Sequence, residues 1–148
     1  MAKTKKEMGM EYFQEGYNCA QAVFGAFAKE MDFTFYEAVK LAAPFGGGMG
    51  RMREVCGAVT GMYMVLGRLE GYNSPNPEKQ KALYETVQML AEKFKAQTGS
   101  IVCKEITGLA KDGATPEKRT EEYYKKRPCV EIVGLACEIL DEYLSSKK

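Results

Sequence analysis

Apolar residues recur at intervals of three and four positions along nearly the whole chain. This spacing lines up apolar side chains on one face of an α-helix. No segment keeps the alternation of β-branched and polar residues that a half-buried strand would show for more than a few positions. The sequence therefore predicts an all-α fold, a compact bundle of about six helices with a glycine-rich loop.

Capping and breaking residues set the expected helix boundaries. Asn18 and Thr34 are good N-cap residues, and Glu37 completes a capping box with Thr34. We expect helices over residues 4–14, from Asn18 onward, and over 34–44, 53–69, 78–97 and 128–144, with short helical pieces over 101–107 and 117–126. The glycine-rich loop is expected at residues 44–50. A chain of 148 residues is expected to form one domain over residues 1–148.

Histidine is absent from the chain, whereas cysteine occurs five times. The chain therefore lacks the base for Ser–His or Cys–His catalysis and any histidine ligand for zinc or haem. A net charge of +1 favours no nucleic-acid partner. The basic N-terminus is not followed by the apolar segment of a signal peptide, and the longest apolar run, residues 55–67, is too short to span a bilayer. We expect a cytoplasmic protein without membrane insertion, whose thiols are free, catalytic or metal-bound.

Four of the five cysteines fall at predicted helix starts, each after a cap, a proline or the glycine-rich loop; they are Cys19, Cys56, Cys103 and Cys129. Cys103, for example, lies three residues after a Ser100 cap. A helix N-terminus carries unpaired N–H groups and about half a positive elementary charge, which lowers the pKa of a cysteine. We therefore predict that these four are redox thiols, or metal ligands if a cluster or metal is bound. Cys137 lies in the middle of a helix, where packing in the core is the better interpretation.

Glycines surround the position of Cys56. Gly57 and Gly61 share about one side of a predicted helix, where each glycine costs roughly 1 kcal/mol relative to alanine. Close approach of another helix or of a bulky inorganic group is expected to offset that cost. The loop over residues 46–50 fits neither glycine-rich phosphate-binding pattern, and we expect it to turn sharply beside the thiols. We therefore predict that the main chain of four glycines surrounds the site and any cofactor bound there: Gly48, Gly50, Gly57 and Gly61.

These residues form an ordered pattern. Asn18-Cys19-Ala20 supplies a first cysteine, residues 56–61 read CGAxxG after Gly48-Met49-Gly50, and Cys103 and Cys129 follow. Over about residues 10–140 the chain resembles the redox-active protein family named for its C_GCAxxG_C_C pattern. More remotely, it resembles the non-haem domain of split-Soret cytochromes c, which is associated with an iron–sulfur centre, although no CxxCH motif for haem attachment is present. The resemblance implies redox chemistry at the four cysteines.

Three functions stay open on the sequence alone. The first is an iron–sulfur cluster or other thiolate-bound metal centre that exchanges electrons with a redox partner protein, although no two cysteines form a CxxC pair. The second is a metal-free thiol–disulfide relay or sensor, with no cofactor, for which Cys19 and Cys56 are the first pair to consider. The third is a non-catalytic helical interaction module with structural cysteines. The sequence slightly favours the first function and leaves open whether the protein is an enzyme or a homo-oligomer.

Overall fold

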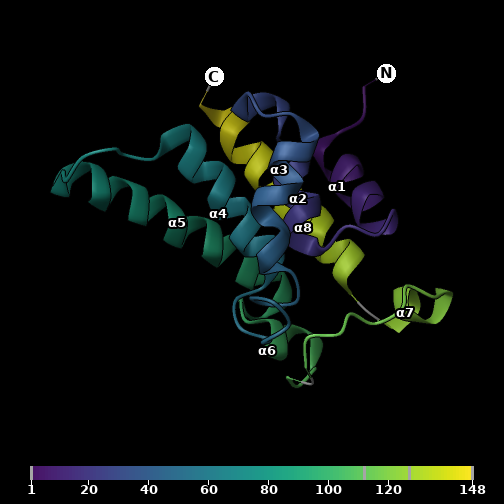
Figure 1. Ribbon diagram of the computed structural model, residues 1–148. Coiled ribbons are helices and arrows are strands. Elements are labelled where there is room, and N and C mark those ends of the chain that lie inside the picture. Colours follow the sequence, from purple (N-terminus) through teal and green to yellow (C-terminus); the bar gives the residue numbers. More distant parts are fainter. Residues whose placement is uncertain (1, 112, 127, 148) are drawn as a thin grey trace.

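The computed structural model describes residues 2–111, 113–126 and 128–147. Within these ranges the regular structure is helical, apart from one isolated β-bridge, so the all-α prediction is confirmed. The α-helices, shown in Figure 1, are α1 (Lys5–Gln14), α2 (Cys19–Ala26), α3 (Phe35–Ala42), α4 (Gly57–Glu70), α5 (Pro77–Thr98), α6 (Cys103–Thr107), α7 (Glu121–Lys126) and α8 (Cys129–Ser146). Two single-turn 3₁₀ helices, η1 (Lys29–Met31) and η2 (Ala43–Phe45), flank α3.

Reciprocal caps begin the first three α-helices. Thr34 accepts a hydrogen bond from the N–H of Glu37 (3.1 Å), whose carboxylate accepts one from the Thr34 N–H (2.8 Å). The predicted capping box at this position is therefore confirmed. Thr4 and Asn18 form equivalent boxes before α1 and α2. Each box satisfies two N–H groups that a helix end leaves without partners inside the helix.

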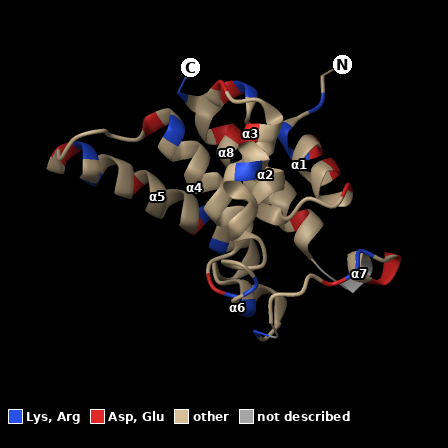
Figure 2. Cartoon of the chain, viewed as in Figure 1, with Lys and Arg blue, Asp and Glu red and all other residues tan. Residues whose placement is uncertain are grey.

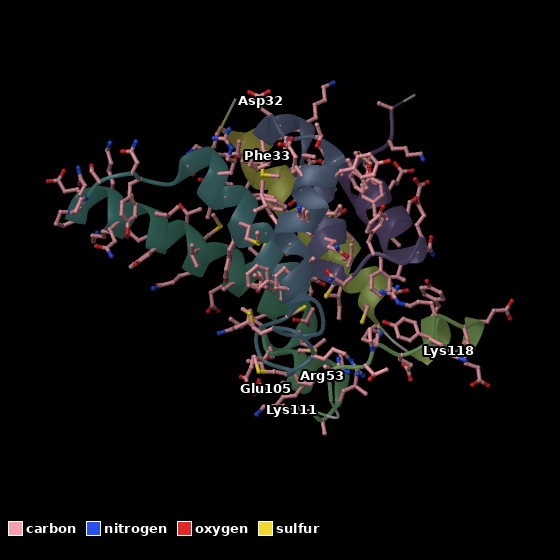
Figure 3. The ribbon with its side chains drawn as sticks, in the orientation of Figure 1. Asp32, Phe33, Arg53, Glu105, Lys111 and Lys118 are labelled. Carbon is pink, nitrogen blue, oxygen red and sulfur yellow. The ribbon has the colours of Figure 1, made fainter. Side chains whose placement is uncertain are left out.

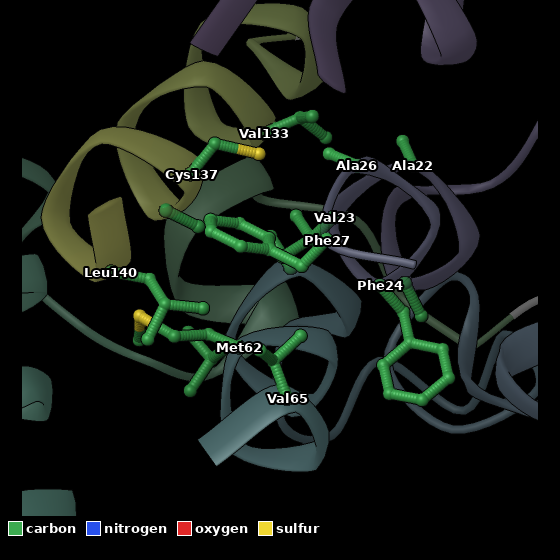
Figure 4. Close-up of a cluster of buried hydrophobic side chains, with 14 of the residues drawn as sticks. Ala22, Val23, Phe24, Ala26, Phe27, Met62, Val65, Val133, Cys137 and Leu140 are labelled. Atoms are coloured by element: carbon green, nitrogen blue, oxygen red, sulfur yellow. The ribbon is translucent and has the colours of Figure 1, made fainter. Parts of the chain in front are cut away.

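The core lies where α2 packs between α1, α4 and α8. The contact between α1 and α8 and that between α2 and α4 are the most extensive, and α3 covers α2 on another side. Figure 4 shows Phe27, the residue that follows α2, among side chains from α4 and α8, including Met62 and Leu140, and all three are fully buried. Cys137 of α8 is fully buried in the same core, which confirms the interpretation made for it. Large apolar side chains of this kind supply most of the free energy of folding.

The longest helix, α5, belongs to the bundle only at its C-terminal end. Its buried residues are Leu90, Ala91 and Phe94, while its first turns and the preceding loop project outward (Figure 1). In the view of Figure 2 both signs of charge are spread over several helices. Among the described residues, no helix is long and apolar enough to cross a membrane.

Three helix starts differ from the sequence predictions by more than one residue. The helix expected over 53–69 begins at Gly57, and the piece expected over 101–107 begins at Cys103. Both predictions placed the start too early because the preceding residues pair with each other, as described below. The piece expected over 117–126 begins at Glu121. Upstream of it, Arg119 instead donates hydrogen bonds to the carbonyls of Phe13 (2.9 Å) and Tyr17 (3.1 Å).

Candidate functional site

Cys19 is the first residue of α2, as predicted. Its neighbour Asn18 connects the start of α2 to the segment that follows α3. The side chain of Asn18 accepts a hydrogen bond from the N–H of Gln21 (2.8 Å) and donates one to the carbonyl of Ala43 (3.0 Å). Gly46 packs directly on Asn18, because a Cβ at Gly46 would lie 2.5 Å from the Asn18 Cγ. The start of α2 and the glycine-rich loop are therefore held as one unit.

The glycine-rich loop winds left-handed. The φ angles of residues 47–51 all lie between 61° and 73°, and two of these residues, Met49 and Arg51, are not glycine. A left-handed conformation costs a non-glycine residue about 1–2 kcal/mol. Main-chain hydrogen bonds hold the winding, among them those from the N–H of Arg53 to the Gly47 carbonyl (3.1 Å) and from the N–H of Glu54 to the Gly48 carbonyl (3.0 Å). The predicted sharp turn is confirmed, and such strain is typical of functional segments.

Glycines of this loop lie against the thiols. The N–H of Gly47 faces the Cys19 sulfur and favours its thiolate. A Cβ at Gly48 would lie 2.8 Å from the Cβ of Cys103, so a side chain there has no room. Gly50 lines the cavity described below, and its left-handed φ of 61° favours glycine there. The loop therefore forms one wall of the site.

An isolated antiparallel β-bridge joins Val55 to Val102 and places Cys56 beside Cys103. The N–H of Cys56 donates to the Ile101 carbonyl (2.8 Å), and that of Cys103 donates to the Glu54 carbonyl (2.6 Å). Cys56 is consequently the N-cap of α4 rather than a residue of its first turns, and Cys103 is the first residue of α6 rather than the third after a Ser100 cap. Ser100 instead accepts a hydrogen bond from the Val102 N–H (2.9 Å).

The two glycines of the CGAxxG segment face α2. A Cβ at Gly57 would lie 2.5 Å from the Cys19 sulfur and 2.8 Å from the Phe45 carbonyl oxygen. A Cβ at Gly61 would lie 2.9 Å from the Ala20 carbonyl oxygen. The expected close approach of another helix is therefore confirmed. It is this approach that brings the Cys19 sulfur to the start of α4.

One cavity of about 370 Å³ collects all four cysteines of the predicted set. Cys19, Cys56, Cys103 and Cys129 line it from the starts of α2, α4, α6 and α8. Arg51, Arg53 and Arg119 also line it, and Arg53 is only 6% exposed. Figure 3 shows Arg53 at the end of the molecule where the glycine-rich loop meets α6. Sequence positions more than a hundred residues apart thus meet at one site.

The predicted lowering of the thiol pKa values is wrong for Cys19 and Cys56. Burial raises the pKa of Cys19, against the smaller opposite effect of the Gly47 N–H. Burial also raises the pKa of Cys56, and negative charge on Cys19 or Cys103 would raise it further, while the N–H groups of Ala58 and Val59 act in the opposite direction. Helix N-termini do face these sulfurs, but loss of hydration outweighs them. Both thiols are protonated at neutral pH unless a positive charge joins them.

The four thiols of the cavity are the groups available to hold a metal centre. Four thiols are the usual complement of an iron–sulfur cluster. Among the described residues, no three cysteines, aspartates or glutamates are grouped closely enough to hold a single metal ion. A zinc ion would require each sulfur about 2.3 Å from the metal. A cluster spreads its thiolate ligands further apart, because its inorganic core lies between them. The described residues therefore offer four thiols on one cavity but no grouping for a single ion.

Sequence reasoning missed several other residues that line the cavity. Phe13 of α1, Tyr123 of α7 and Ile132 of α8 line it, together with Arg119. The Arg119 guanidinium stacks on the ring of Phe13 (4.3 Å to the centroid) and on that of Tyr123 (4.9 Å). No local motif marks these residues, since they come from three distant parts of the chain. The packing of α1 on α8 and the hydrogen bond from Arg119 to the Phe13 carbonyl (2.9 Å) bring them together.

Comparison with known proteins agrees with the family resemblance that the ordered cysteine pattern indicates. The sequence profile of the family described as "Putative redox-active protein (C_GCAxxG_C_C)" matches residues 17–143. The chain belongs to this family. An uncharacterized protein of Archaeoglobus fulgidus is 26% identical over 155 residues, which cover 99% of this chain and 97% of that protein. No solved structure matches the chain.

Proposed function

We propose that this family member is an electron-transfer protein whose cysteine-lined cavity holds an iron–sulfur cluster. The observation that carries the proposal is that Cys19, Cys56, Cys103 and Cys129, from four separate helix starts, line one cavity. Cysteines that only fill space have no reason to gather at helix N-termini. When bound, such a cluster would accept and release single electrons.

The chain's own groups suit a negatively charged thiolate centre. The helix N-termini and the N–H groups of Gly47, Ala58 and Val59 face the sulfurs and favour negative charge on them. Buried Arg53 adds a positive charge to the lining. Apolar Phe13 and Ile132 also line the cavity. The cavity is therefore preorganised to stabilise negatively charged thiolates, although the metal-free thiols are neutral.

The raised pKa values of Cys19 and Cys56 distinguish this proposal from a bare thiol–disulfide couple. A thiol attacks a disulfide only as the thiolate, so these two groups are poor nucleophiles at neutral pH. A bound cationic centre removes the obstacle, because it deprotonates the thiols that coordinate it. The mutual influence of Cys19, Cys56 and Cys103 still supports the relay as a second candidate.

One experiment separates the candidates. The protein is purified without oxygen, and its visible spectrum, iron, zinc and acid-labile sulfide are measured, with Cys137→Ala as the matched control. We expect colour with iron and sulfide in both proteins. A colourless anaerobic protein that cannot be reconstituted with iron and sulfide would refute the cluster. Reversible loss of two thiols would then favour the relay, and thiols that stay inert until unfolding would favour a structural module.

A further inference from the structure

Residues 113–119, between α6 and α7, form a short segment beside the cysteine cavity. As far as the structure describes this part of the chain, the segment belongs to no helix or strand, and it runs along the outside of the bundle (Figure 1). Ala114, Pro116 and Glu117 of the segment are exposed to solvent and also line the cavity. The segment, which we call the strap, therefore stands between part of the cavity and the solvent.

Arg51 ties the first part of the strap to the glycine-rich loop. Its guanidinium donates hydrogen bonds to the carbonyls of Gly113 (3.1 Å) and Thr115. Its N–H donates to the Gly46 carbonyl (3.0 Å), so this side chain extends from the same loop that packs against the thiols. The bonds to the strap are exposed, and water competes for both partners. This end of the strap is therefore held by bonds that break at low cost.

Arg119 holds the other end of the strap more firmly. Its guanidinium donates partly buried hydrogen bonds to the carbonyls of Phe13 (2.9 Å) and Tyr17 (3.1 Å). It also stacks on the rings of Phe13 and Tyr123. A cation gains more from an aromatic ring where water is excluded. When the strap moves, we therefore expect the Arg119 end to stay in place and the Arg51 end to be released.

We infer that the strap opens and closes the cysteine cavity, with Arg51 as its latch and Arg119 as its anchor. Segments outside helices and strands open at a lower free energy than the helices of a core. The closed strap shields the thiols from bulky molecules, and the open strap admits a cofactor or a partner. The role of the strap in redox chemistry rests on the proposed function, whereas its opening is a property of the metal-free protein.

The first test compares two variants that each remove one positive charge. Arg51→Met removes the latch, and Lys118→Met, at an exposed position of the strap itself, is the matched control. The reduced, metal-free proteins are treated with a maleimide that carries a long polyethylene glycol chain. The labelling rate of each cysteine is followed by peptide mass spectrometry, and circular dichroism checks that the variants fold.

We expect the half-buried thiols, Cys19 and Cys129, to be labelled about tenfold faster without the latch, because loss of a charged hydrogen bond corresponds to a roughly tenfold larger open fraction. The Lys118→Met control should keep the wild-type rate. Loss of a positive charge by itself disfavours thiolates and slows labelling, so faster labelling reports opening. Equal rates in the two variants overturn the inference.

The second test uses the wild type alone, so it decides the matter even if Arg51→Met does not fold. Labelling by N-ethylmaleimide is measured in low concentrations of urea. Opening of the strap exposes little surface, so the rate at Cys19 should change little with urea, whereas the rate at the fully buried Cys137 should rise steeply. An equal urea dependence would show that both thiols are reached only through global unfolding, which overturns the inference.

Failure of the strap and failure of the proposed function can be told apart. If the wild type takes up no iron and sulfide, the proposed function fails, while both labelling experiments on metal-free protein still decide whether the strap opens. If the wild type takes up both, and Arg51→Met is labelled no faster than Lys118→Met, the proposed function stands and the strap is not a gate.

Discussion

Replacing Gly57 by alanine should destabilise the protein and shift Cys19. The new Cβ would lie 2.5 Å from the Cys19 sulfur, 2.8 Å from the Phe45 carbonyl oxygen and 3.2 Å from the Ala20 nitrogen. Two of these neighbours are backbone atoms, so α2 and α4 must separate. Overpacking of this kind costs about 1–3 kcal/mol. The better helix propensity of alanine returns about 1 kcal/mol, which leaves a net loss of up to about 2 kcal/mol.

Gly67 provides the matched control in the same helix. A Cβ there meets no atom within 4 Å, so Gly67→Ala should stabilise the protein by about 1 kcal/mol. Urea unfolding of the two variants should therefore differ by about 1–3 kcal/mol in the free energy of unfolding. Alkylation of Cys19 should be faster in Gly57→Ala than in Gly67→Ala. Equal stabilisation by both substitutions would refute the close approach of α2 to α4.

Further predictions concern the core, pH and the caps. Gly9→Ala should cost up to about 2 kcal/mol, because its Cβ would lie 2.6 Å from the Cys137 sulfur while the better helix propensity of alanine offsets about 1 kcal/mol, and adding Cys137→Ala should restore most of the loss in urea unfolding. Burial raises the pKa of Cys137 to about 12, above that of an unfolded thiol, so the folded state keeps its proton while the unfolded state loses it. The contribution of Cys137 to stability should therefore be constant below about pH 8.5 and fall by up to about 1.4 kcal/mol per pH unit above it, in addition to the falls from Cys19 and Cys56. Cys137→Ala should show a smaller slope than the wild type, and an unchanged slope would contradict this. Asn18→Ala should cost more than the roughly 1 kcal/mol expected for Thr34→Ala, because Asn18 also donates to the Ala43 carbonyl, and equal thermal shifts would argue against that bond.

Sequence reasoning located the thiols but not their electrostatics. Asn18 and Pro128 mark helix starts by local rules, so Cys19 and Cys129 were correctly placed. The pKa prediction for Cys19 and Cys56 failed because it counted the helix N-termini, which local sequence reveals, without the burial, which depends on the other helices.

The sequence by itself determined the all-α fold, the capping boxes and the core position of Cys137, because these depend on spacings of three or four residues within one helix. Only the tertiary structure decided that the Val55–Val102 bridge delays the starts of α4 and α6, and that Phe13 and Arg119 complete the cavity. Bringing distant segments together costs loop-closure entropy, which the contacts between them must offset. No local sequence pattern reveals those contacts.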